Sequence, residues 1–156
     1  MIDQGDMLPD VGMTDADGAP IALRSFVGRP LVLYFYPKDD TPGCTREAQD
    51  FSALSDDFAA AGAAILGISK DPPAKHRKFI AKHDLQLSLA SDEDGAVLDA
   101  FGVWIEKSMY GRSYMGIERA TFLFDAGGAL VQIWRKVKVP GHAQSVLEAV
   151  RALPAS

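Results

Sequence analysis

The chain has 156 residues, of which 47% are hydrophobic and 24% charged, a composition typical of a globular chain and compatible with one domain over residues 1–156. Its net charge of −5 disfavours nucleic acid and anionic membranes as partners, and no basic run contradicts this. The first residues do not resemble a signal peptide, no apolar run reaches the length of a membrane span, and a single cysteine excludes an internal disulfide, so we expect a cytoplasmic protein.

The N-terminal part of the chain is dominated by residues that favour turns. Residues 7–29 are rich in Asp, Gly and Pro. Two short apolar patches, residues 7–11 and 21–23, flank the turn sequence Asp15-Ala16-Asp17-Gly18. We predict a small hairpin or edge addition here, followed by a turn at residues 28–30.

The centre of the chain is predicted to be a buried strand followed by a long helix. Residues 31–36 are an unbroken apolar and aromatic run, which Pro37 ends because proline has no N–H for a sheet ladder. A Thr-Pro pair at residues 41–42 stands where a helix begins, and apolar residues recur at steps of three and four over residues 43–61. Gly62 is placed to end this helix.

The second half of the chain is predicted to alternate strands and helices. Strands are predicted over residues 63–69, 85–89, 120–124 and 129–134, and helices begin at residues 71–73, span residues 97–101 and follow Gly141. Residues 105–118 are polar and predicted to be irregular. A β-α-β half followed by a β-hairpin and a final helix is the order of the thioredoxin fold, so the predicted class is α/β with helices on both faces of a sheet.

Cys44, the single cysteine, falls in the first turn of the long predicted helix. N–H groups in a first helical turn lack intrahelical partners, and the macrodipole adds partial positive charge there, so both stabilise a thiolate. Cysteines at such positions can have a pKa well below the free value of about 8.5. The residues alone leave two interpretations open: a reactive nucleophile, or a small buried side chain that only fills space.

Two blocks of the sequence resemble one known family. The string Pro37-x-x-x-Thr41-x-x-Cys44 matches the active-site motif of the peroxiredoxins, and residues 34–47 (YFYPKDDTPGCTRE) are similar to the bacterioferritin-comigratory, or peroxiredoxin Q, subfamily. Residues 110–122 (YGRSYMGIERATF) resemble the same subfamily. The resemblance covers nearly the whole chain. It implies a thioredoxin fold with an N-terminal hairpin and inserted elements at residues 72–104, and an antioxidant, thiol-dependent peroxidase acting on hydrogen peroxide and organic hydroperoxides.

The resemblance implies roles for three catalytic residues. Cys44 is implied to be the peroxidatic cysteine, whose thiolate attacks a hydroperoxide and becomes a sulfenic acid. The hydroxyl of Thr41 is implied to face the sulfur and the peroxide, although its position alone favours a helix N-cap. Arg119 is implied to lie beside the sulfur and to stabilise the thiolate and the developing oxyanion, although its position alone favours a solvated arginine at a strand end.

Three further residues are implied to support the site. Pro37 would shield the thiolate from water and shape the loop, and the N–H groups of Gly43 and Cys44 would donate to the peroxide. Glu47 matches a family position that helps to orient the arginine, and a surface acid near the positive end of the helix dipole is an equal alternative. No metal site and no cofactor are implied.

The chain departs from the subfamily at Gln49. Many members have a resolving cysteine at this position, five residues after the peroxidatic one, and no second cysteine is present here. A one-cysteine peroxiredoxin is therefore expected, in which an external thiol such as thioredoxin, or glutaredoxin with glutathione, reduces the sulfenic acid. Further oxidation to sulfinic acid at high peroxide is then expected. Members of this subfamily are often monomers, and a monomer is expected.

Other functions remain open from the sequence. Cys44 could serve a thiol-based redox sensor or relay that forms mixed disulfides with partner proteins, or it could be a packing residue in a non-catalytic thioredoxin-fold domain. Cys-x-x-Cys is absent, which disfavours a disulfide oxidoreductase. The histidines and the loop acids carry no further motif, so they are predicted to be ordinary surface residues: His76, His83, His142, and residues 39–40 and 92–94.

Overall fold

The computed structural model describes residues 2–154. Its main strands are β1 (Gly12–Asp15), β2 (Pro20–Ala22), β3 (Leu31–Phe35), β4 (Ala64–Ser69), β5 (Ser88–Ser91), β8 (Ala120–Phe124) and β9 (Leu130–Trp134). Its helices are the 3-10 helix η1 (Leu23–Phe26), α1 (Pro42–Ala53), α2 (Ser55–Ala60), α3 (Pro73–His83), α4 (Ala96–Phe101) and α5 (His142–Arg151). β6 (Trp104–Met109) and β7 (Arg112–Ile117) form a second, two-stranded sheet.

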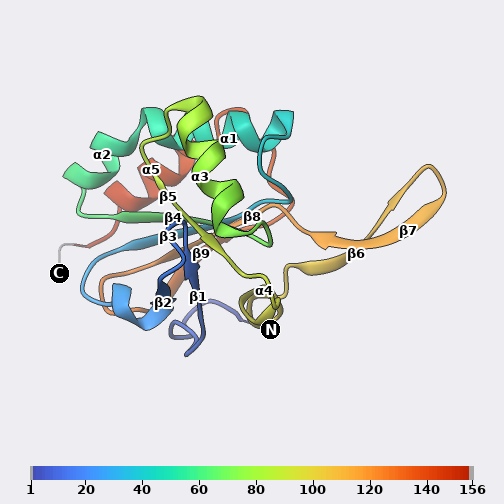
Figure 1. Cartoon of the computed structure of the whole chain (residues 1–156). Helices are drawn as coiled ribbons and strands as arrows, with labels where there is room; N and C mark the ends of the chain where they lie inside the picture. Colours follow the sequence, from blue (N-terminus) through green and yellow to red (C-terminus); the bar gives the residue numbers. More distant parts are fainter. Residues whose placement is uncertain (1, 155–156) are drawn as a thin grey trace.

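A seven-stranded mixed sheet forms the middle layer, with the strand order β2-β1-β5-β4-β3-β8-β9. Helices α1, α2, α3 and α5 cover one face of this sheet, and α4 lies on the other side (Figure 1). The α/β class predicted from the sequence is therefore confirmed, as are the N-terminal hairpin and the final helix. The strand predicted over residues 85–89 lies further along the chain, at β5. Within residues 2–154, no helix is long and apolar enough to cross a bilayer.

β3 lies inside the sheet because all five of its residues are apolar or aromatic and all are buried. It pairs in parallel with β4, where Leu33 lies opposite Leu66, and antiparallel with β8, where Leu33 lies opposite Phe122. Successive side chains of a strand point to opposite faces, so β3 contributes to a hydrophobic core on each side of the sheet. The loop that leaves its carboxyl end begins where open α/β sheets commonly place their sites.

The helix predicted over residues 43–61 is two helices, which corrects the sequence prediction. α1 ends at Ala53 and α2 begins at Ser55, because Leu54 between them leaves helical geometry, with φ −100° and ψ 7°. Phe51 and Phe58 nevertheless face the same core. The apolar period continues across the break, which is why the spacing of residues did not reveal it.

Residues 105–118, predicted to be irregular, contain most of β6 and all of β7 instead. These strands form a hairpin that projects from the body of the molecule (Figure 1). Tyr110 and Gly111 make its turn with φ of 53° and 77°, the positive values that a two-residue hairpin requires. Most of the hairpin is exposed on both faces, so it lacks the alternation of apolar and polar residues by which strands are recognised.

Candidate active site

Cys44 is the third residue of α1, just after the loop that follows β3. Thr41 occupies the N-cap position, and its carbonyl accepts the N–H of Thr45 at 2.8 Å. The N–H groups of Gly43 and Cys44 precede that hydrogen bond, so they belong to the helix donors that have no partner four residues earlier. Cys44 is 2% exposed, so its sulfur is almost completely shielded from bulk solvent.

Arg119, in the short connection between β7 and β8, brings a guanidinium to this sulfur. Its Nη2 lies 3.3 Å from Sγ of Cys44, and its Nη1 lies 2.7 Å from Oε1 of Glu47. Cys44 and Glu47 are one helical turn apart, so one planar fork binds both side chains. An adjacent cation and a helix N-terminus both stabilise a thiolate.

Glu47 is buried, with 1% exposure, beneath the guanidinium of Arg119. Its second oxygen, Oε2, has no hydrogen-bond partner among residues 2–154. Burial raises the pKa of the Glu47 carboxyl from 4.5 to about 7, although the positive charge of Arg119 opposes the rise. The alternative that Glu47 is a surface acid is therefore wrong. With a pKa of about 7, this carboxyl titrates near neutral pH.

Gly43 leaves room for the guanidinium. A Cβ atom at this position would lie 3.2 Å from Nη2 of Arg119, which is closer than most real Cβ contacts. The backbone of the first helical turn can therefore approach Arg119 closely only because residue 43 has no side chain.

Thr41 does not cap the helix with its side chain. Its hydroxyl donates to the carbonyl of Lys38 at 2.9 Å, and no side-chain hydrogen bond joins it to the first turn of α1. This corrects the N-cap interpretation of Thr41. With its hydrogen engaged, the oxygen still has lone pairs that can accept a hydrogen bond. Pro37 is half-buried at the start of the same loop.

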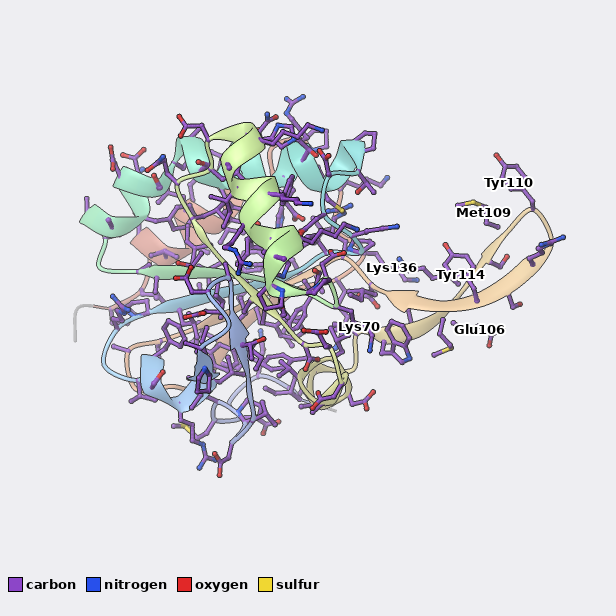
Figure 2. All side chains as sticks on the ribbon, in the orientation of Figure 1. Lys70, Glu106, Met109, Tyr110, Tyr114 and Lys136 are labelled. Carbon is purple, nitrogen blue, oxygen red and sulfur yellow. The ribbon has the colours of Figure 1, made fainter. Side chains whose placement is uncertain are left out.

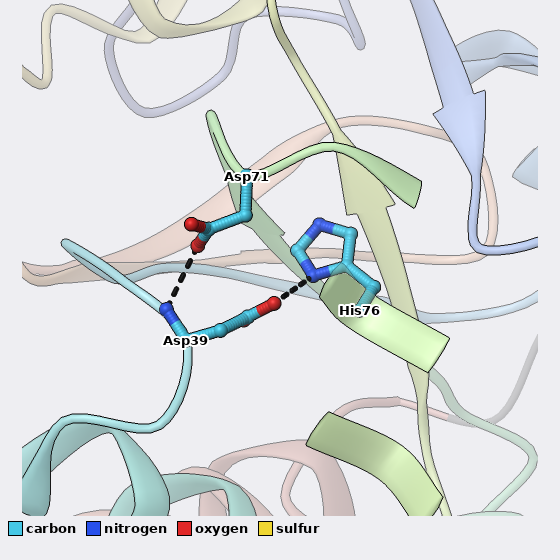
Figure 3. A group of neighbouring side chains, drawn as sticks. All are labelled: Asp39, Asp71 and His76. Atoms are coloured by element: carbon cyan, nitrogen blue, oxygen red, sulfur yellow. Dashed lines mark hydrogen bonds and ion pairs between the residues drawn. The ribbon is translucent and has the colours of Figure 1, made fainter. Parts of the chain in front are cut away.

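Asp39 anchors the loop between β3 and α1 through contacts with Asp71 and His76 (Figure 3). Asp39 is 3% exposed. Its Oδ2 lies 2.7 Å from Nδ1 of His76, its Oδ1 accepts the hydroxyl of Tyr36 at 2.5 Å, and its N–H donates to Oδ2 of Asp71 at 2.8 Å. Asp39 and His76, expected at the surface, are therefore buried. A single sequence could not reveal this pair because the two residues lie 37 positions apart.

The carboxylates of Asp39 and Asp71 and the ring of His76 are close enough to surround a metal ion. Their donor atoms are already engaged, however. Nε2 of His76 lies 3.0 Å from the carbonyl of Ala90, and Oδ2 of Asp71 also accepts the hydroxyl of Ser69 at 2.8 Å. The group therefore acts as a hydrogen-bonded anchor of the loop.

His142 and Asp92 also lie inside the protein, which corrects their predicted exposure. His142, at the start of α5, is 7% exposed, and its Nε2 lies 2.7 Å from Oγ1 of Thr121. Burial, followed by the positive charge of Arg119, lowers the pKa of His142 from 6.5 to about 4, so its ring is neutral at pH 7. Asp92 accepts the N–H of Leu98 at 2.8 Å. His83 and Asp40 pair with each other at a more exposed position, at 2.9 Å.

Lys107 of β6 is a neighbour of the site that the sequence prediction missed. Burial and then the charge of Arg119 lower its pKa, whereas Cys44 and Glu118 raise it. The prediction of an irregular segment hid this residue. The pairing of residues 104–109 with residues 112–117 places Lys107 opposite Tyr114, on the strand that leads to Arg119.

Known proteins match this chain over most of its length. The AhpC/TSA family matches residues 4–133. Peroxiredoxin Bcp of Xanthomonas campestris is 50% identical over 143 residues, which are 92% of this chain and 89% of the relative. Peroxiredoxin Bcp of Bacillus subtilis is 44% identical over 150 residues, which are 96% of each chain.

Solved structures match equally well. The bacterioferritin comigratory protein of X. campestris has a TM-score of 0.89 at 48% identity, over 96% of this chain and 98% of that chain. A mutant of Xylella fastidiosa PrxQ has a TM-score of 0.92 at 38% identity, over 97% of both. The predicted thioredoxin fold of the peroxiredoxin type is confirmed, and the chain belongs to the AhpC/TSA family, among its Bcp or peroxiredoxin Q members.

Proposed function

We propose that this peroxiredoxin, a thiol-dependent peroxidase, reduces hydrogen peroxide and organic hydroperoxides at Cys44, with Arg119 and Thr41 as its other catalytic residues. The 3.3 Å contact between Nη2 of Arg119 and Sγ of Cys44 carries the proposal. This contact places the permanently charged guanidinium of Arg119 beside the single thiol of the chain. That thiol lies in the first turn of helix α1. The relative from X. campestris has alkyl peroxide reduction activity, which supports organic hydroperoxides as substrates.

The reaction is a displacement at oxygen. The thiolate of Cys44 attacks the terminal oxygen of the hydroperoxide, the O–O bond breaks, and the leaving alkoxide or hydroxide takes a proton to become alcohol or water. Cys44 is oxidised to a sulfenic acid. Negative charge moves from sulfur to the leaving oxygen, so the guanidinium of Arg119 and the free N–H groups of Gly43 and Cys44 stabilise the transition state.

Thr41 and Pro37 complete this arrangement. The hydroxyl of Thr41 gives its own hydrogen to Lys38, so its oxygen acts as acceptor for the O–H of the incoming hydroperoxide. Pro37 keeps water from the sulfur. Glu47 holds the guanidinium of Arg119 in place through the 2.7 Å contact, and it is a positioning residue because the sulfur does not touch it.

The catalytic cycle closes with a thiol from outside the chain. Cys44 is the single cysteine, so the sulfenic acid has no internal thiol to attack it. An external thiol forms a mixed disulfide and releases water, and a second thiol then restores Cys44. We propose thioredoxin, or glutaredoxin with glutathione, as this reductant. We further propose a monomeric protein of the cytoplasm that contributes to cell redox homeostasis.

The test is peroxide consumption with dithiothreitol as reductant, for the parent chain and for Cys44→Ser. Sustained turnover that disappears in Cys44→Ser supports the enzyme. Mass spectrometry after one equivalent of peroxide should show one added oxygen on Cys44. A single round of oxidation that no reductant converts into turnover would instead indicate the redox sensor or relay, and an unreactive Cys44 would leave a packing residue.

A further inference from the structure

The hairpin formed by β6 and β7 holds most of the large apolar side chains that are exposed in the described part of the chain. Of the six such side chains among residues 2–154, four lie on it: Met109 is 56% exposed, Tyr110 98%, Tyr114 45% and Met115 49%. Figure 2 shows the hairpin standing clear of the body, with Tyr110 at its tip. Apolar side chains gathered on a projecting element indicate a surface for interaction.

The two faces of this hairpin differ. Residues directly opposite each other share a face, and the pairs Lys107–Tyr114 and Met109–Arg112 lie on one. Glu106 and Met115 form a pair on the other face. In Figure 2, Tyr114 and Met109 accordingly lie on one side of the ribbon and Glu106 on the other.

The face with Lys107 and Tyr114 leads to the active site. Lys107 and Tyr114 both pack against Gly116, which has no side chain. A Cβ atom at Gly116 would lie 3.2 Å from Cδ of Lys107 and 3.4 Å from Cε2 of Tyr114. The side chain of Lys107 therefore points toward the base of the hairpin. β7 ends at Ile117, and Arg119 follows two residues later with its guanidinium at Sγ of Cys44. The charges of Cys44 and Arg119 both act on Lys107.

This part of the chain is basic although the whole chain is acidic. Residues 104–119 and 135–138 hold six lysines and arginines and two acids, which leaves ten lysines and arginines and nineteen acids elsewhere. Lys136 lies on the same side of the molecule as Tyr114, beside the base of the hairpin (Figure 2). An acidic partner is therefore drawn to this end of the molecule and repelled from the rest of it.

We propose that the hairpin face formed by Lys107, Met109, Arg112 and Tyr114 is the docking surface for an acidic protein dithiol that reduces Cys44. The proposal rests on the proposed function, in which an external thiol must reach the oxidised sulfur. The apolar side chains supply contact area, and the cations supply orientation. A small thiol does not contact this surface while it reacts with Cys44, because it is too short to reach from Cys44 to the outer part of the hairpin.

Docking serves the reduction of the Cys44 sulfenic acid by the partner's two thiols. A thiolate of the partner attacks the sulfur of the Cys44 sulfenic acid, the S–O bond breaks, and the hydroxyl leaves as water with one proton. The second thiol of the partner then attacks the mixed disulfide. Cys44 leaves as thiolate, and the partner is left with an internal disulfide, oxidised by two electrons.

The experiment compares one protein reductant with one small reductant in peroxide turnover. Thioredoxin, recycled by thioredoxin reductase and NADPH, is tested against dithiothreitol. The variants are Met109→Ser with Tyr114→Ser, and separately Arg112→Glu. Met115→Ser is the matched control, because Met115 is equally exposed on the opposite face of the same hairpin. Glutaredoxin with glutathione is tested in parallel as a second protein reductant.

We expect kcat/KM for the protein reductant to fall about tenfold in both variants and to stay within about twofold in Met115→Ser. Turnover with dithiothreitol and the single-turnover oxidation of Cys44 should be unchanged in all three. The rate with the protein reductant should also fall with salt in the parent, and less steeply in Arg112→Glu.

Three outcomes would overturn the docking surface. The first is an equal loss of turnover with dithiothreitol and with the protein reductant. The second is an equal loss of turnover in the variants and in Met115→Ser. The third is a parent chain that turns over with dithiothreitol but with neither thioredoxin nor glutaredoxin. Failure of the proposed function looks different, since the parent would then not turn over peroxide with dithiothreitol at all.

Discussion

Nη2 of Arg119 lies 3.3 Å from Sγ of Cys44, although 75 positions separate the two residues in the chain. The contact arises because β3 and β8 are neighbours in the sheet. Cys44 follows β3 at its carboxyl end, and Arg119 precedes β8, which is antiparallel to β3. The helix that follows β3 and the connection that precedes β8 thus bring the nucleophile and the cation to the same end of these two strands.

Arg119→Met should slow the oxidation of Cys44 by hydrogen peroxide about 10²- to 10³-fold, because it removes the cation that stabilises both the thiolate and the leaving oxygen. Arg119→Lys should recover little, since an ammonium cannot bind Sγ and Glu47 with one planar fork. Stopped-flow oxidation of the reduced protein measures the effect. Arg46→Met is the matched control on the exposed side of α1, and equal rates in both variants would remove Arg119 from the mechanism.

Gly43→Ala should slow the same reaction about tenfold while the protein remains folded. The new Cβ would lie 3.2 Å from Nη2 of Arg119, so the guanidinium must move by a few tenths of an ångström away from its contact with the sulfur. Gly127→Ala, whose Cβ would meet only Asp125 at an ordinary distance of 3.4 Å, is the control. If both variants oxidise like the parent, the close approach at Gly43 does not matter for catalysis.

The sequence predicted those parts of the site that depend on local signals. Pro37 at the end of a buried strand, Thr41 and Pro42 at a helix start and Cys44 in the first turn were visible as a pattern. The contact between Arg119 and Cys44 was expected from the family resemblance alone, because spacing in one sequence does not show which strands become neighbours.

The features that the sequence did not predict depend on tertiary contacts. His76 is buried because its Nδ1 meets Asp39 and its Nε2 meets a backbone carbonyl, and neither partner is near in sequence. The β6–β7 hairpin was missed because its strands pack against little else, so burial left no periodic mark on them. The break at Leu54 was missed because a change of two backbone angles leaves the apolar spacing intact.

The unfolding free energy of the parent should fall relative to Glu47→Gln as the pH rises from 4.5 to about 7. Burial raises the pKa of Glu47 to about 7, so the folded state keeps a proton that the unfolded chain has already released, and stability is lost with rising pH in this window. The total change should be about 1–3 kcal/mol. Urea titrations across this range measure it. Parallel pH profiles for the two proteins would show that the Glu47 carboxyl is already ionised in the folded state.

His142→Gln should make the protein less sensitive to mild acid. Burial lowers the pKa of His142 to about 4, so between pH 6.5 and 4 the unfolded chain binds a proton that the folded state does not. Stability of the parent is therefore lost as the pH falls through this window, in the direction opposite to the effect of Glu47. Urea titrations of the single and double variants separate the two contributions. If His142→Gln follows the parent profile, the ring is not held neutral by burial.

His76→Ala should destabilise the fold by about 3–5 kcal/mol, because it leaves the buried carboxylate of Asp39 without one of its partners. His83→Ala is a matched control, since His83 pairs with Asp40 at 2.9 Å in the same loop at a more exposed position and should change stability little. Chemical denaturation of both variants gives the comparison. Equal effects would mean that the Asp39–His76 pair is no more than a surface ion pair. Because Asp39 holds the loop that carries Thr41, His76→Ala should also slow the oxidation of Cys44, whereas His83→Ala should not.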